Sequence, residues 1–304
     1  MHRTEQPFTS GGTYLRGMIR CSVAAGLLGE PLEGTAPIAR RWLAVEHRPT
    51  WGRDVGADAG PVIAGLAVRA AAAGARLALI RAVGRPPTDE RLRVFLADTT
   101  PDRTRLTGLW CTPSDLSTLP LPNDPDGPLP GDAVTEPVLL VCTHARRDQC
   151  CAIEGRALAG RLAEQVPHVW QCSHLGGHRF SPTAVVLPTG YVYGRLDVDG
   201  AVAAVKAAAA GEVETASSRG RSTWAPAGQV AELAVRELTG ERQASALDVA
   251  PEHDGHVMVR HADGRSWRVA VERRTLPDTR PESCGKPDKP VSAVVATEVR
   301  PAGR

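Results

Sequence analysis

The sequence predicts an α/β (α+β) protein with two consecutive units of the same element order, followed by a helix and a small β extension. Strand-like apolar runs and a helical segment occur in the order β-α-β-β-α, and this order returns after residue 132. Residues 122–132, almost entirely Pro, Gly and Asp, separate the two units as a linker. Hydrophobic residues make up 42% of the 304 residues, which is enough for two cores.

The first unit is expected at residues 17–121, after a flexible tail at residues 1–16. Its helix begins at Pro61, a position where proline is tolerated, and stops before Gly74. The predicted elements are a short helix at 21–28, a strand at 41–46, a helix at 61–73, strands at 76–83, 93–98 and 108–112, and a helical turn at 114–121.

The second unit is expected at residues 133–215 and the extension at 216–304. The second unit should contain a strand at 138–141, a helix at 151–166, a strand at 168–172, a hairpin of 183–188 and 191–196, and a helix at 202–210. Its first strand leads into a helix that begins at a cysteine, which resembles thioredoxin-like domains, so the fold prediction is of tandem thioredoxin-like units. The extension should hold a helix within 219–238, a hairpin at 256–274, a loop at 277–290 and a strand at 292–299.

Charge and composition exclude several classes of partner. The formal net charge of +2 indicates neither nucleic acid nor an anionic membrane. The first sixteen residues are polar and do not resemble a signal peptide, and no run of eighteen apolar residues occurs, so a cytoplasmic location is expected. In that compartment seven cysteines favour ligands, redox residues and buried side chains over disulfides.

Two pairs of soft ligands lie close together in the second unit. Cys142 and Cys151 are separated by eight residues, and His174 and His178 by three. Thiolates and imidazoles hold soft and borderline metals, and the N-terminus of the expected helix favours the thiolate form. The Gly176–Gly177 pair permits backbone angles that aim both imidazoles in one direction. The pattern therefore predicts a metal centre where the two loops meet.

The other cysteines are assigned by position. Cys150 precedes Cys151 directly and is an alternative ligand, although the two side chains should point about 100° apart on a helix. Cys172 can lie on either face of its strand. We interpret Cys21, Cys111 and Cys284 as structural or incidental, with the loop at Cys284 able to approach the site.

Three motifs carry a resemblance to a known family. Cys142, His144, Arg147, Asp148 and Cys151 form C-x-H-x-x-R-D-x-x-C, and W-x-x-S-H-x-G-G-H-R-F and L-P-x-G-x-x-Y-G-R follow at 170–180 and 187–195. Together with segments at 30–36, 42–52 and 219–237, they make the chain similar to the sucrase/ferredoxin-like family, whose members resemble thioredoxin-like ferredoxins.

The resemblance implies a [2Fe-2S] cluster held by Cys142, Cys151, His174 and His178, as in a bis-histidinyl branch among fungal relatives. The implied function is single-electron transfer with a redox partner, a reductase or an acceptor, in place of catalysis on a substrate of its own. Neutral imidazoles on one iron should raise the reduction potential. The first unit carries no cluster motif, and no pair of carboxylates indicates glycoside hydrolysis.

Other readings of the same residues remain. A structural zinc site could use the same two cysteines and two histidines. A Rieske centre is a weaker reading. Cys142 with His144 and Cys172 with His174 each form C-x-H, but no C-x-x-H follows either pair. A dithiol oxidoreductase acting through Cys150 and Cys151 lacks C-x-x-C, and a ligand-free binding module would need no metal.

Overall fold

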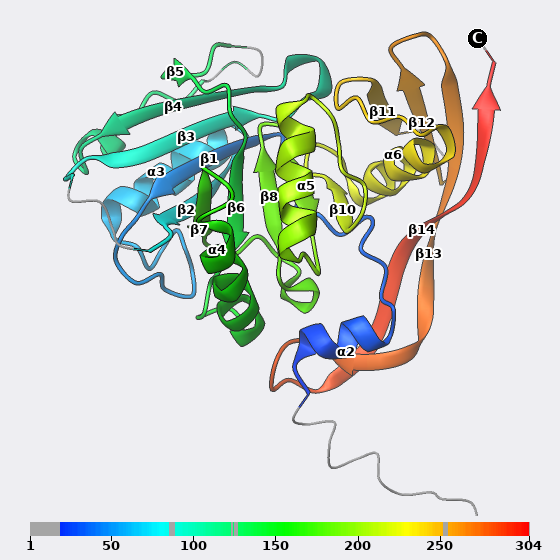
Figure 1. Cartoon of the computed structure of the whole chain (residues 1–304), viewed down its shortest axis with the longest axis horizontal. Helices are drawn as coiled ribbons and strands as arrows, with labels where there is room; N and C mark the ends of the chain where they lie inside the picture. Colours follow the sequence, from blue (N-terminus) through cyan, green and yellow to red (C-terminus); the bar gives the residue numbers. More distant parts are fainter. Residues whose placement is uncertain (1–18, 85–88, 123, 125–126, 252–254, 304) are drawn as a thin grey trace, which may run out of the picture.

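The computed structural model describes residues 19–84, 89–122, 124, 127–251 and 255–303. These residues form two β-sheets and five α-helices (Figure 1). The tail predicted at residues 1–16 lies outside the described residues. Within the described part of the chain, no helix combines the length and apolar character needed to cross a membrane.

The larger sheet has ten strands in the order β10-β9-β8-β6-β7-β2-β1-β3-β4-β5. Along the chain they are β1 (Arg41–Glu46), β2 (Ala75–Ala82), β3 (Leu92–Asp98), β4 (Arg105–Cys111), β5 (Asp132–Ala133), β6 (Val138–Cys142), β7 (Val169–Cys172), β8 (Ala184–Leu187), β9 (Tyr191–Tyr193) and β10 (Ser218–Arg221).

The two halves of this sheet repeat one pairing pattern. In the first half, β1 is parallel to β2 and antiparallel to β3, and β3 is antiparallel to β4. In the second half, β6 is parallel to β7 and antiparallel to β8, and β8 is antiparallel to β9. Strands β2 and β7 join the halves as antiparallel neighbours, with Ile80 opposite Cys172. The repeated strand order predicted from the sequence is therefore present, within one continuous sheet.

Three helices cover this sheet: α3 (Pro61–Ala72) in the first half, and α4 (Arg156–Leu162) and α5 (Val198–Ala209) in the second. Side chains alternate between the faces of β6, as the period of a strand requires. Leu139 packs against Leu158 of α4. Leu140 and Cys142 face a different core that also contains Trp42 of β1. The last residue of β6 thus brings its thiol into the core between the halves.

The predicted linker lies along the first half of the sheet. The guanidinium of Arg41 donates to the carbonyl of Asp124 at 3.0 Å, and the hydroxyl of Thr107 donates to the carbonyl of Pro130 at 2.7 Å. The short strand β5 then pairs with β4. Backbone carbonyls of this proline-rich segment are therefore held by side chains of the sheet.

The smaller sheet has the order β11-β12-β13-β14 and packs against helix α6 (Pro226–Thr239). Its strands are β11 (Leu247–Pro251), β12 (His256–His261), β13 (Ser266–Pro281) and β14 (Asp288–Ala302). The hairpin predicted at 256–274 is confirmed as β12 and β13, which pair antiparallel. Helix α6 is joined to the larger sheet because its Arg236 donates to the hydroxyl of Tyr191 in β9 at 3.1 Å, and this hydroxyl donates to Glu232 of the same helix.

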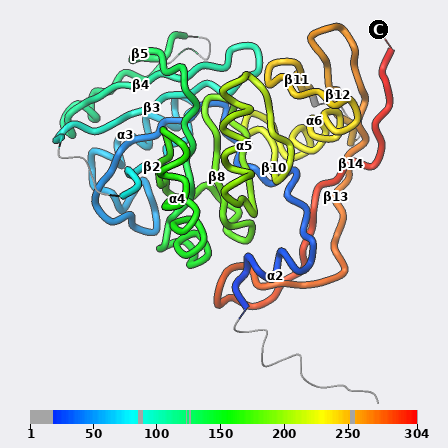
Figure 2. Tube along the Cα trace, viewed as in Figure 1, coloured from blue at the N-terminus to red at the C-terminus, as the bar shows by residue number. Residues whose placement is uncertain are grey.

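The loop predicted at 277–290 is wrong for most of its length. Strands β13 and β14 continue to Pro281 and Asp288, so only residues 282–287 form the turn. Four prolines in this segment favoured the loop prediction. In a two-stranded ribbon each strand has one free edge, which tolerates proline. The tip of the long hairpin lies beside helix α2 (Cys21–Leu27), as the chain trace shows (Figure 2).

Candidate metal centre

Three of the predicted ligands meet at one end of the second half of the sheet. Cys142 ends β6, Cys151 begins a π-helical turn (Cys151–Gly155) that leads into α4, and His174 follows β7. Their ligand atoms all lie within 4.8 Å of one another. Both thiols are fully buried and the imidazole is half-buried. We call these three residues cluster A.

The two thiols of cluster A form a pair with opposite pKa shifts. The thiol of Cys151 donates a hydrogen bond to Cys142, and the His174 imidazole lies beside it, so the pKa of Cys142 falls well below its usual range despite burial. The same pairing, together with burial, raises the pKa of Cys151. The thiolate form, which is the form that binds metal, is therefore favoured at Cys142.

His144 holds the backbone of His174, the histidine of cluster A, through a hydrogen bond. Its Nε2 lies 2.7 Å from the carbonyl oxygen of Gly52, and its Nδ1 accepts the backbone N–H of His174 at 3.2 Å. These two bonds fit a neutral ring that donates through Nε2. Among the described residues, the Nδ1 of His174 itself is buried without a hydrogen-bond partner. Such an atom is available to a ligand.

Two glycines allow the close approaches that build cluster A. An added Cβ at Gly155 would lie 2.0 Å from the carbonyl oxygen of Cys142, so this position must be glycine for the π-helical turn to pack on β6. Gly177 has a φ of 70°, and its Cα faces the guanidinium of Arg219, which donates to the carbonyl of Gly176 at 3.0 Å. The unusual backbone angles predicted for the glycine pair are confirmed.

His178, the fourth predicted ligand, lies outside the 4.8 Å group of cluster A. Its ring stacks on that of His174 with a centroid distance of 6.0 Å. Its Nδ1 lies 3.3 Å from Oδ2 of Asp148 and 3.2 Å from the sulfur of Cys21. The histidine therefore stands between cluster A and a second group of ligands.

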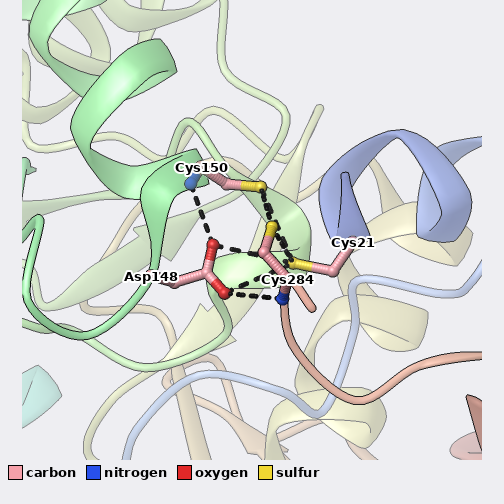
Figure 3. Close-up of side chains that lie close together, drawn as sticks. All are labelled: Cys21, Asp148, Cys150 and Cys284. Atoms are coloured by element: carbon pink, nitrogen blue, oxygen red, sulfur yellow. Dashed lines mark hydrogen bonds between the residues drawn. The ribbon is translucent and has the colours of Figure 1, made fainter. Parts of the chain in front are cut away.

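This second group, cluster B, consists of Cys21, Asp148, Cys150 and Cys284, whose ligand atoms also lie within 4.8 Å of one another (Figure 3). The sulfur of Cys150 lies 3.6 Å from that of Cys21 and 3.3 Å from that of Cys284. The remaining pair of sulfurs is 3.6 Å apart. Cys150 lies directly before the π-helical turn, whereas Cys21 begins α2 and Cys284 lies in the hairpin turn.

Asp148 organises cluster B through its two oxygens. Oδ1 accepts the backbone N–H of Cys150 at 2.8 Å, and Oδ2 accepts that of Cys284 at 3.1 Å. A hydrogen bond from the Cys21 thiol, followed by one from the Ser22 hydroxyl, lowers the pKa of Cys150 to about 6. A thiolate is therefore favoured here as well.

The sequence identified cluster A and missed most of cluster B. It expected Cys21 and Cys284 to be structural or incidental, but both lie in cluster B, and only the approach of the Cys284 loop was anticipated. The adjacent pair of Cys150 and Cys151 is the signal for two groups of possible ligands, because their side chains diverge. Cys111 and Cys172 are buried and belong to neither cluster.

The chain was compared with protein-family models, with curated proteins and with solved structures. The model of the sucrase/ferredoxin-like family matches residues 32–220. No curated protein and no solved structure matches the chain. The match includes all of cluster A and His178, but it ends before Cys284 and begins after Cys21.

Proposed function

Because the chain belongs to the sucrase/ferredoxin-like family, we propose that it is an electron-transfer protein with a [2Fe-2S] cluster. The ligands would be Cys142, Cys151, His174 and His178. The observation that carries the proposal is the convergence of the first three of these residues, which come from three separate elements, within 4.8 Å.

The donor set of these residues fits an iron–sulfur centre. Two buried sulfurs, one of them favoured as thiolate, match the ligands that such clusters take. The buried Nδ1 of His174 without a partner among the described residues supplies an imidazole donor. Asp148 accepts from Nδ1 of His178, which leaves Nε2 as the nitrogen able to bind a metal.

A bound cluster would supply one-electron chemistry at a potential raised by imidazole ligation. The protein's own residues bury the two sulfurs. The carbonyl of Gly52 fixes the tautomer of His144, and Arg219 positions the Gly176–Gly177 loop. The half-buried histidines lie closer to solvent than the cysteines, so electron exchange with a redox partner protein would take place on the histidine side.

The remaining features of the proposal concern fold and location. We infer that each half is a thioredoxin-like unit, with the boundaries predicted from the sequence; the repeated strand pairing supports this. The cluster-free first half would serve as scaffold or docking surface. A cytoplasmic location would keep all seven cysteines reduced.

A zinc site on the same residues is the second candidate. Three ligand atoms within 4.8 Å also suit a single ion, and thiolates and imidazoles are ordinary zinc ligands. This candidate differs from the first in colour, in sulfide content and in redox activity.

The test is metal and sulfide analysis of the full-length protein purified without oxygen, with absorption and low-temperature EPR spectra. We expect red-brown protein with about two iron and two sulfide per chain, and a rhombic signal after reduction. Serine at Cys142 or Cys151 should remove the colour. Colourless protein whose zinc is lost in these variants would establish the zinc site in place of the iron–sulfur cluster.

A further inference from the structure

Cluster B has the composition of a metal site that is separate from cluster A. Three sulfurs form a triangle with sides of 3.3, 3.6 and 3.6 Å, and a carboxylate lies against it. We propose that Cys21, Cys150 and Cys284 bind a zinc ion, with Asp148 at the fourth position. The two proposed sites share no ligand, although Nδ1 of His178 lies 3.2 Å from the sulfur of Cys21 and 3.3 Å from Oδ2 of Asp148.

The spacing of the sulfurs fits zinc coordination. Zn–S bonds of about 2.3 Å at tetrahedral angles place sulfurs about 3.8 Å apart. The sulfurs of cluster B lie a few tenths of an ångström closer than this, so binding requires only small outward movements. They are far beyond the S–S bond length of about 2.05 Å, and all three residues are free cysteines.

The surroundings of the three sulfurs are built to hold them. The hydroxyl of Ser22 donates to the sulfur of Cys150 at 3.2 Å and to Glu154 at 2.8 Å. Either oxygen of Asp148 lies within 3.8 Å of the sulfur of Cys21 while it accepts a backbone N–H. Hydrogen bonds of this kind orient metal ligands and are part of the site.

Ion pairs of Glu30 hold helix α2 and the tip of the β13–β14 hairpin, which we call the outer segments, next to cluster B. The buried carboxylate of Glu30, just after α2, accepts from Arg280 of β13 at 2.5 and 2.9 Å and from Arg179 at 2.6 Å. These bonds bring helix α2 and the hairpin tip to the loop after β7 that carries His174 and His178. Zinc at cluster B would fasten both segments across that loop, next to cluster A.

Zinc binding here is an exchange of protons for metal. Zn²⁺ displaces up to three thiol protons to solvent, forms three Zn–S bonds and leaves every oxidation state unchanged. Oxidation of two of the thiols to a disulfide would compete with it, which makes the state of the thiols part of the test.

The experiment measures zinc, iron and sulfide in the full-length protein purified without oxygen and with zinc supplied. Cys21→Ser, Cys150→Ser and Cys284→Ser are compared with Cys111→Ser, a buried cysteine outside both clusters. We expect about one zinc per chain in the wild type and the control, and about a tenfold loss in each of the three variants. Iron should stay the same in all five proteins.

The two proposals fail separately. Absence of iron from every protein, with zinc lost only in the three variants, would contradict the iron–sulfur cluster and support the zinc site. Zinc retained in the three variants, or lost only with Cys142→Ser, would overturn the zinc site. The zinc site would also be overturned if protein supplied with zinc and reductant took up no metal and formed a Cys150–Cys284 disulfide.

The wild-type protein provides a test that no folding defect can obscure. Cys284 is the partly exposed member of cluster B. Zinc should slow its alkylation by N-ethylmaleimide about tenfold, and a chelator should restore the rate, as followed by peptide mass spectrometry. Equal rates with and without zinc would count against the site.

Discussion

The sulfurs of Cys150 and Cys151, neighbours in the sequence, lie in two different clusters. That of Cys150 is 3.3 Å from the sulfur of Cys284, whereas that of Cys151 lies with Cys142 and His174. Consecutive residues of a helical turn point about 100° apart, so one pair of cysteines can serve two sites. The positions of the two sulfurs therefore assign Cys151 to cluster A and Cys150 to cluster B.

Serine substitutions should separate the two cysteines. We expect Cys151→Ser to lower the iron content about tenfold or more, because serine is a poor ligand to iron in such clusters. Cys150→Ser should leave iron unchanged. Cys172→Ser is the control, since Cys172 lies opposite Cys142 in the sheet but belongs to neither cluster. Iron and sulfide analysis decides the outcome, and loss of iron from Cys150→Ser would reverse the assignment.

The sequence predicted those parts of the site that depend on local spacing. Cys142 and Cys151 flank one loop, and His174 follows the neighbouring strand, so the parallel pairing of β6 with β7 brings them together. Cys21 and Cys284 could not be predicted in the same way. Cys284 lies in the turn of a hairpin whose prolines are typical of a loop. The segments of Cys21 and Cys284 meet through the pairing of Glu30 with Arg280, which are 250 residues apart in the sequence.

Replacing either histidine by cysteine tests the iron–sulfur ligands. Thiolate carries a negative charge that neutral imidazole lacks, so the oxidised cluster is stabilised. We expect His174→Cys and His178→Cys each to lower the reduction potential by on the order of 100 mV. His168→Cys, a partly exposed histidine before β7 and outside both clusters, serves as the control. Protein-film voltammetry measures the shift, and potentials unchanged in both variants would exclude these ligands.

Alanine at Gly155 tests the close packing behind cluster A. The new Cβ would meet the carbonyl oxygen of Cys142 at 2.0 Å, so the π-helical turn must move away from β6. We expect a loss of about 1–3 kcal/mol in the free energy of unfolding and a loss of iron. Gly160→Ala, on the same helical segment with open space around it, should instead stabilise by about 0.5–1 kcal/mol. Urea unfolding distinguishes them, and equal effects of the two substitutions would contradict the packing argument.

We expect the packing of helix α2 and the β13–β14 hairpin tip against the loop after β7 to depend on pH through Glu30. Burial alone would raise the pKa of its carboxyl, but hydrogen bonds and charges of Arg280 and Arg179 outweigh this effect and lower it. A carboxyl with a lowered folded-state pKa stabilises the fold above its unfolded pKa. That stabilisation is lost as the pH falls through the folded-state pKa.

Glu30→Gln should therefore destabilise the protein by about 3 kcal/mol at neutral pH, because the buried Arg280 and the partly exposed Arg179 lose a charged partner. The difference from wild type should shrink as the pH falls from the ordinary carboxyl pKa through the lowered folded-state pKa of Glu30, where the wild-type carboxyl also becomes neutral. Glu298→Gln breaks an exposed pair with Arg300 and should cost about 0–1 kcal/mol. Urea unfolding across this pH range provides the measurement. A difference that is the same at neutral and acid pH would show that the Glu30 charge does not hold the segments closed.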